Sequence, residues 1–166
     1  MKITKTEQGS IFEAVCLDAT KRSAYFNFKQ VWKFVDSPIC WGPDNGTDLI
    51  GLNQDDTYTA IQCKDKDTID KRGIDSFLTD SNRKIIRNRY IISSGNSISA
   101  NAQRAIDGQE KPCGVILGDE LNAIIAAIGK QEAVVPVKIA PLPHQKTAIA
   151  DVVAGLGAAD RGQLLM

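Results

Sequence analysis

Three polar residues, Asp48, Gln62 and Lys64, accompany two short segments that otherwise have the composition of β-strands. The segments, 47–52 and 57–64, flank a four-residue polar turn, which predicts a β-hairpin. Side chains alternate along a strand, so Gln62 and Lys64 share one face, and pairing Asp48 with Gln62 would bring all three together. Strand interiors usually exclude such residues, so this pattern favours chemistry over packing.

The chemistry these groups could perform is metal-dependent hydrolysis. A carboxylate, an amide oxygen and the backbone carbonyl of Cys63 are hard oxygen ligands suited to Mg²⁺, with Mn²⁺ as an alternative. A neighbouring ammonium could orient a water molecule or stabilise the charge that develops at a phosphate. The single histidine, His144, excludes a multi-histidine metal site and leaves carboxylates, lysine and a hard metal ion for hydrolysis. The alternative interpretation is a solvated hairpin face.

Composition narrows the function classes. The 166 residues carry 20 Lys or Arg and 20 Asp or Glu, so no overall charge attracts nucleic acid and any contact with phosphates must be local. The four cysteines form no C-x-x-C pair, which argues against a zinc site and is typical of reduced thiols in a cytosolic protein. The sequence shows no signal-peptide core and no apolar run of about 18 residues, so we expect a soluble, cytoplasmic protein.

Hydrophobic periodicity and turn residues predict the elements that must position the polar set. The expected order is α-β-β-β-α-β-α-β-α, an α/β fold with a mixed sheet flanked by helices. Besides the hairpin, we expect helices over 9–19, 68–83, 99–106 and 119–128, and strands over 29–35, 89–93 and 113–117. Thr68 is the expected N-cap of the second helix.

The character of the sequence changes after residue 130. The stretch "VVPVKIAPLPHQ" contains three prolines, which mark a linker, while "HQKTAIADVVAGL" is typical of a helix and "GQLLM" of a strand that lacks a partner. We therefore predict a domain over 1–130, a Pro-rich linker over 131–143, and the opening of a further, truncated domain over 144–166.

The segments "GTDLIG" and "AIQCK" resemble the D-x(n)-Q-x-K form of the PD-(D/E)xK motif in Mrr-like nucleases. Together with "IDSFLTDSNR", "RYIISSGNSISANAQRAIDGQ" and the tail, they resemble the N-terminal region of large single-chain restriction enzymes. The resemblance implies a restriction-endonuclease-like fold with an α-β-β-β-α-β core. It also implies DNA as substrate, a helicase-type ATPase and a methyltransferase in the same parent chain, and a second nuclease domain for cutting both strands.

The resemblance also assigns roles to site residues. Asp48 becomes the metal-binding aspartate, in preference to Asp44 of the literal "PD" pair, and Lys64 the motif lysine. Gln62 stands where most relatives have Asp or Glu and would bind the metal with the Cys63 carbonyl. Glu13 resembles the additional acidic residue that some branches add to the metal site.

Two further sets of residues follow from the same resemblance and from the local charge. Gln145 would contact adenine in the full-length protein, where ATP would bind; the segment lacks a G-x-x-x-x-G-K-[ST] loop, so it should not hydrolyse ATP alone. The predicted DNA contacts are Lys66, Lys71, Arg72, Ser94 and Asn96. A charged helix face and simple loop polarity are the alternative interpretations of those five residues.

Three functions remain open from the sequence. The first is a metal-dependent DNA endonuclease domain of a restriction enzyme, coupled to an ATP-driven translocase. The second is a catalytically silent, DNA-binding copy of the same fold, for which the neutral Gln62 is a hint. The third is a structure-specific nuclease of DNA repair.

Overall fold

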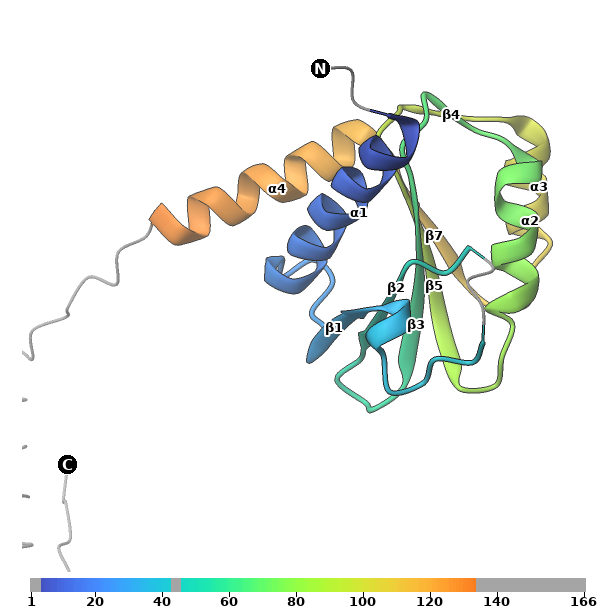
Figure 1. Cartoon of the computed structure of the whole chain (residues 1–166), viewed down its shortest axis with the longest axis horizontal. Coiled ribbons are helices and arrows are strands. Elements are labelled where there is room, and N and C mark those ends of the chain that lie inside the picture. Colours follow the sequence, from blue (N-terminus) through green and yellow to red (C-terminus); the bar gives the residue numbers. More distant parts are fainter. Residues whose placement is uncertain (1–3, 43–45, 134–166) are drawn as a thin grey trace, which may run out of the picture. The chain divides into compact units, whose positions relative to one another are not determined.

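A five-stranded mixed sheet forms the centre of the computed structural model, which describes residues 4–42 and 46–133 (Figure 1). Its strands lie in the order β1-β2-β3-β5-β7; β1, β2 and β3 pair antiparallel, whereas β3, β5 and β7 pair parallel. The strand bounds are β1 Gln30–Lys33, β2 Leu49–Leu52, β3 Tyr58–Lys64, β5 Ile86–Ser93 and β7 Cys113–Ile116. A small parallel sheet joins β4 (Thr68–Ile69) to β6 (Ser97–Ile98).

Two helices cover each face of the central sheet. Helices α1 (Lys5–Arg22) and α4 (Gly118–Ala133) lie on one face, and α2 (Lys71–Asp80) and α3 (Ala100–Asp107) lie on the other (Figure 1). A short 3-10 helix, η1 (Phe34–Asp36), follows β1. The predicted mixed α/β sheet flanked by helices is therefore confirmed. No helix in the described ranges is long and apolar enough to cross a membrane.

The hairpin of β2 and β3 contributes side chains to two separate hydrophobic cores. Leu49 and Ile61 pair across the strands and pack in the core beneath α1 and α4. The next pair, Ile50 and Ala60, packs in the core beneath α2 and α3. Because β3 is buried on both faces, its interior is largely apolar, and Thr59 and Gln62 are its buried polar residues.

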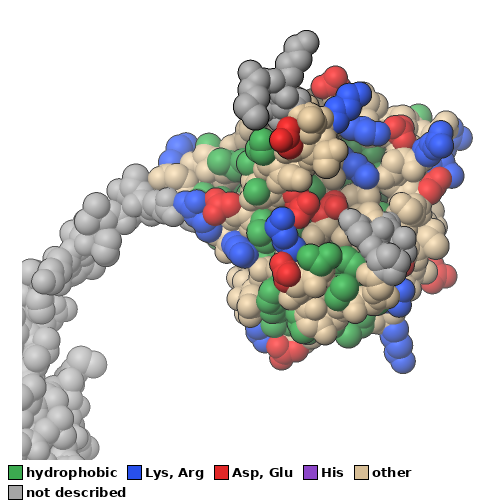
Figure 2. Space-filling model, viewed as in Figure 1, with side chains coloured by type: hydrophobic (Ala, Val, Ile, Leu, Met, Phe, Trp, Pro, Cys, Tyr) green, Lys and Arg blue, Asp and Glu red, His purple; other side chains and the backbone are tan. Residues whose placement is uncertain are grey.

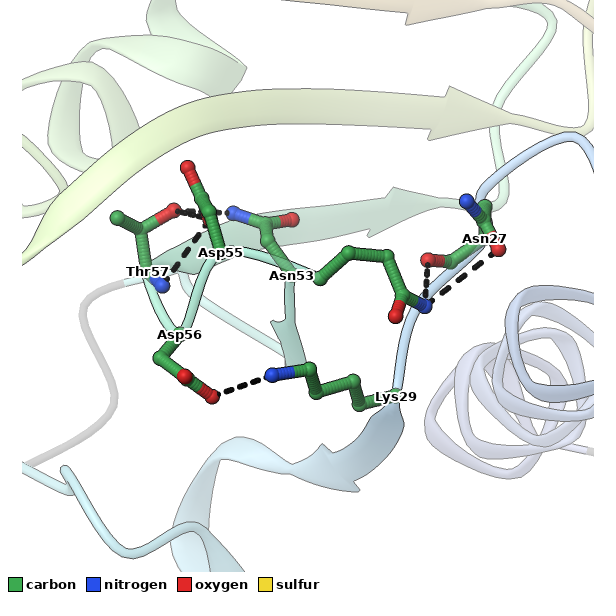
Figure 3. A network of polar contacts seen from close by, with 7 residues as sticks. Asn27, Lys29, Asn53, Asp55, Asp56 and Thr57 are labelled. Atoms are coloured by element: carbon green, nitrogen blue, oxygen red, sulfur yellow. Dashed lines mark hydrogen bonds and ion pairs between the residues drawn. The ribbon is translucent and has the colours of Figure 1, made fainter.

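The turn of this hairpin is held by local polar contacts. The Asn53 side-chain amide donates to the Thr57 hydroxyl at 2.8 Å, and this hydroxyl donates to the Asp55 carboxylate at 2.6 Å (Figure 3). Lys29 forms an ion pair with Asp56 at 2.6 Å on the same turn (Figure 3). These contacts fix the loop length and with it the register of the two strands.

The start of α2 corrects a sequence prediction. Thr68 does not cap this helix but lies in β4, and Asp70 is the N-cap, accepting a hydrogen bond from the Gly73 amide at 2.7 Å. Thr68 and Asp70 are both residue types that cap helices, and the pairing of Thr68 with β6 leaves Asp70 as the cap. The helix ends at Asp80, three residues before the predicted end.

Other element bounds differ from prediction by a few residues. Helix α1 begins earlier than predicted because Thr4 and Glu7 form a capping box at its start, and it also continues to Arg22, past the predicted end. Strand β1 ends at Lys33, β5 begins at Ile86, and α4 runs to Ala133, past the predicted boundary at 130. The described residues belong to one compact unit that ends at Ala133. The helix predicted from residue 144 lies outside the described residues.

Candidate functional site

Asp48 immediately precedes β2 and is fixed against β3. Its backbone amide donates to the Ile61 carbonyl at 2.9 Å, and its Oδ2 accepts a hydrogen bond from the Cys63 amide at 2.6 Å. Asp48 thus contacts the residues on both sides of Gln62, and the pairing of Leu49 with Ile61 continues to Asp48 and Gln62. The predicted antiparallel register is confirmed. On its other side, the Asp48 carbonyl accepts a hydrogen bond at 2.8 Å from the amide of Phe34, the first residue of η1.

The Gln62 side chain is fully buried, yet neither polar atom of its amide has a hydrogen-bond partner in the described part of the chain. It packs against Gly46, where an added Cβ would lie 2.6 Å from Gln62 Nε2. Gly46 also has a φ of +96°, so a side chain is disfavoured there twice over. A buried polar group without a partner costs about 1–3 kcal/mol, and a bound ion, ligand or water molecule would remove that cost.

Glu13, Lys33 and Asp48 line one cavity of about 180 Å³, together with Phe34, Val35 and Thr47. Glu13 comes from the middle of α1, and Asp48 from the start of β2. Lys33, at the end of β1, lies with its Nζ 3.2 Å from Glu13 Oε1. The structure therefore brings Glu13 to the aspartate, as expected, and adds Lys33. The sequence offered one weak signal for Lys33: it lies two residues after the buried Val31, so it faces α1.

Cys63 and Lys64 complete the end of β3. The pKa of the Cys63 thiol is raised well above its ordinary value by its hydrogen bond with Cys16, by burial, and by the negative charges of Asp48 and Glu13. This thiol packs against the α1 core, and the hydrogen bond of Cys63 to Asp48 is made by its backbone amide. Lys64 is half-buried, and strand alternation places it on the same face as Gln62.

The donor atoms at this site fit a hard divalent cation. Asp48 and Glu13 bring two carboxylates to the cavity. The buried Gln62 amide, which has no partner in the described residues, lies at Gly46 and does not line this cavity. The described residues contain no group of three or more His, Cys, Asp or Glu side chains that could hold a metal ion. Mg²⁺ suits such a small set, because it usually binds through one or two carboxylates and keeps several water molecules.

The predicted DNA contacts lie after the carboxyl ends of β3 and β5 and at the start of α2. Lys66 and Lys71 form exposed ion pairs with Asp70 and Asp75, at 3.7 and 3.0 Å. Arg72 is exposed. A DNA-binding role for these three cations stays a prediction.

Ser94 and Asn96 have structural partners. The Ser94 hydroxyl donates to Asp65 at 2.7 Å. Asn96 accepts from the Asp119 amide at 2.7 Å and donates to the Asp119 carboxylate at 2.8 Å, so it holds the first turn of α4. Their contact with DNA also stays a prediction. Gln145 lies outside the described residues.

The hairpin with its Asp, Gln and Lys set, followed by parallel strands and enclosed by helices, defines a restriction-endonuclease-like nuclease domain. A family model described as a restriction endonuclease, of the Mrr catalytic type, matches residues 19–130, and the chain belongs to this family. The match includes Asp48, Gln62 and Lys64 but not Glu13.

Solved structures give two further likenesses. Over 99% of its length, the chain is similar to the ATP-dependent Type ISP restriction-modification enzyme LlaBIII bound to DNA, with 26% identity and a TM-score of 0.61; it spans 12% of that protein. A repair endonuclease from Pyrococcus abyssi matches over 71% of this chain and 49% of its own, with 17% identity and a TM-score of 0.37. The search of curated proteins found no match.

Proposed function

We propose that this chain is the metal-dependent DNA-cleaving domain of a longer restriction enzyme. The observation that carries the proposal is the position of Asp48, held opposite Gln62 by contacts to Ile61 and Cys63, while the buried Gln62 amide lacks a protein partner in the described residues. The likeness to a DNA-bound, ATP-dependent restriction-modification enzyme supports DNA as substrate and coupling to an ATP-driven translocase.

The residues of the chain would divide the chemistry between them. A bound Mg²⁺ or Mn²⁺ would supply Lewis acidity at the phosphate and a water molecule of lowered pKa. Asp48, the Gln62 amide oxygen and the Cys63 carbonyl would hold the ion, with Glu13, which lines the same cavity as Asp48, as an additional ligand. The hydrogen bond from the Cys63 amide fixes one oxygen of Asp48 and so orients its carboxylate.

Lys64 would stabilise the negative charge that develops on the phosphate during hydrolysis. Contacts with the DNA backbone must be local, because the net charge is zero and the acidic and basic side chains are interspersed on the face shown in Figure 2. The exposed cations Lys66, Lys71 and Arg72, near the end of β3, would provide them.

Plasmid cleavage with Mg²⁺ or Mn²⁺ tests the proposal, using this chain and a parent protein that extends beyond it, with ATP. Asp48→Ala and Lys64→Ala should each lower cleavage by at least about a hundredfold, because each removes a charge needed in the transition state. Cys63→Ala should cut like wild type, since only its backbone takes part. Asp56→Ala, which removes a carboxylate at the far turn, is the matched control.

The outcomes separate the alternative functions. Wild-type cutting by Asp48→Ala would overturn the site. No cutting by the intact parent with ATP would assign the chain as a silent DNA-binding copy, for which the small number of carboxylates at the site is the supporting observation. Cleavage confined to branched DNA would assign a structure-specific repair nuclease.

A further inference from the structure

Lys33 has a position that the motif residues do not explain. It ends β1 on the side of the sheet that α1 covers, and its ammonium lies 3.2 Å from Glu13 Oε1. Lys33, Glu13 and Asp48 line the same small cavity. Two carboxylates therefore share this cavity with a lysine whose charge opposes theirs.

We propose that Lys33 is the resident counter-ion of the metal site, and that a divalent cation must displace its ammonium from Glu13 to bind. The inference rests on the proposed metal-dependent function. Two like charges in one cavity repel each other, and the Lys33 charge beside Glu13 offsets that repulsion in the metal-free state. Lys33 would be a positioning residue that sets the metal concentration at which the site fills.

The exposure of the pair suits a displaceable contact. The side chains of Lys33 and Glu13 are 42% and 25% exposed, and ion pairs open to solvent contribute little to stability. The lysine stem is flexible and its ammonium is well hydrated, so it can turn into solvent when a stronger cation arrives. A unit positive charge this close to a divalent ion, in surroundings near bulk water, changes binding by roughly tenfold, and salt reduces this to a few-fold.

The chain offers a matched control for the loss of one positive charge. Lys29 lies four residues before Lys33 and forms an ion pair with Asp56 at 2.6 Å at the hairpin turn (Figure 3). Neither Lys29 nor Asp56 lines the cavity. Lys33→Gln and Lys29→Gln change the net charge equally, but only the first removes a charge from beside Glu13. Lys33→Arg retains the charge at the cavity.

The inference can be tested without a cleavage assay by titrating the 166-residue chain with Mn²⁺ at neutral pH. Calorimetry and electron paramagnetic resonance would measure the binding. Lys33→Gln should bind Mn²⁺ roughly three- to tenfold more tightly than wild type. Lys29→Gln and Lys33→Arg should stay within about twofold of wild type by the same reasoning. In a Glu13→Gln background, the gain from Lys33→Gln should largely disappear.

The failures of the inference and of the proposed function can be told apart. Unchanged or weaker Mn²⁺ binding by Lys33→Gln, while wild type binds, would overturn the counter-ion role and leave Lys33 as a clamp between β1 and α1. An equal gain in Lys29→Gln would show a general charge effect and would also overturn it. No Mn²⁺ binding by wild type or by any of these variants would instead overturn the metal site itself.

Discussion

Replacing Gln62 with methionine should make the fold more stable and the site inactive. The Gln62 side chain has no exposed surface, and its amide nitrogen and oxygen both lack a partner in the described residues. Burying such a group unpaired costs about 1–3 kcal/mol, and an apolar side chain of similar length removes that cost. Methionine is flexible enough to fill the same space against Gly46.

The expected gain is about 1–2 kcal/mol in the free energy of unfolding, after allowance for imperfect packing of the new side chain. For a domain of this size that corresponds to a rise in melting temperature of roughly 4–8 °C. Urea unfolding measured by circular dichroism would give the first quantity, and a thermal scan the second. The same variant should bind Mn²⁺ at least about tenfold more weakly, because it lacks one of the few oxygen ligands.

Thr59→Val is the matched control on the same strand. Thr59 is also buried, but its hydroxyl donates to Asn53 Oδ1 at 2.9 Å. Removing a satisfied hydroxyl should lower the free energy of unfolding by about 0.5–1.5 kcal/mol, the opposite sign to Gln62→Met. A destabilised Gln62→Met would show that the amide is satisfied in the metal-free protein. Wild-type Mn²⁺ binding by that variant would refute its role as a ligand.

Two further predictions concern Asn96 and Cys113. Asn96→Ala should lower the free energy of unfolding by about 1 kcal/mol, because α4 loses its cap. DNA affinity in a mobility-shift assay should be unchanged. Weaker DNA binding without a change in stability would instead establish the predicted DNA contact. Burial raises the pKa of the Cys113 thiol to about 11, against the opposing effect of Arg89. The folded state therefore holds a proton that the unfolded state has lost, and stability falls as pH rises from the ordinary thiol pKa to about 11. Across that pH range the free energy of unfolding of Cys113→Ala should decrease by roughly 1–3 kcal/mol less than that of wild type. An equal decrease in the two proteins would contradict the assignment.

The sequence predicted the hairpin and its register because local and tertiary signals agreed there. Alternating apolar residues and a polar turn predicted two strands, and only one register gathers Asp48 and Gln62 on neighbouring positions. The buried parallel strand over 89–93 was also confirmed within β5, since β-branched residues filled both of its faces. In these elements the strand-forming and turn-forming preferences of the residues agreed with the structure that they adopt.

The sequence could not predict the contacts that depend on packing between distant elements. Lys33 stands in a segment whose other residues are mostly apolar, and its pairing with Glu13 follows only from the way α1 lies across β1. Asn96 looked like an exposed loop residue, because nothing in a single sequence shows that it meets Asp119 at the start of α4. Thr68 was assigned to a helix for a similar reason, since its strand partner Ser97 lies far along the chain.

The neutral residue at position 62 and the lysine at position 33 address the same electrostatic problem. Position 62 is fully buried one residue before Cys63, whose amide binds the Asp48 carboxylate, so an ionised acid there would lose its hydration and be repelled by Asp48. An amide avoids both costs yet retains an oxygen that can bind a cation. Glu13 is more exposed and is already an acid, so it needs a counter-ion, which Lys33 supplies. The two single variants should therefore have opposite effects on cation binding. Gln62→Met removes a ligand and should weaken cation binding, whereas Lys33→Gln removes a competing charge and should strengthen it.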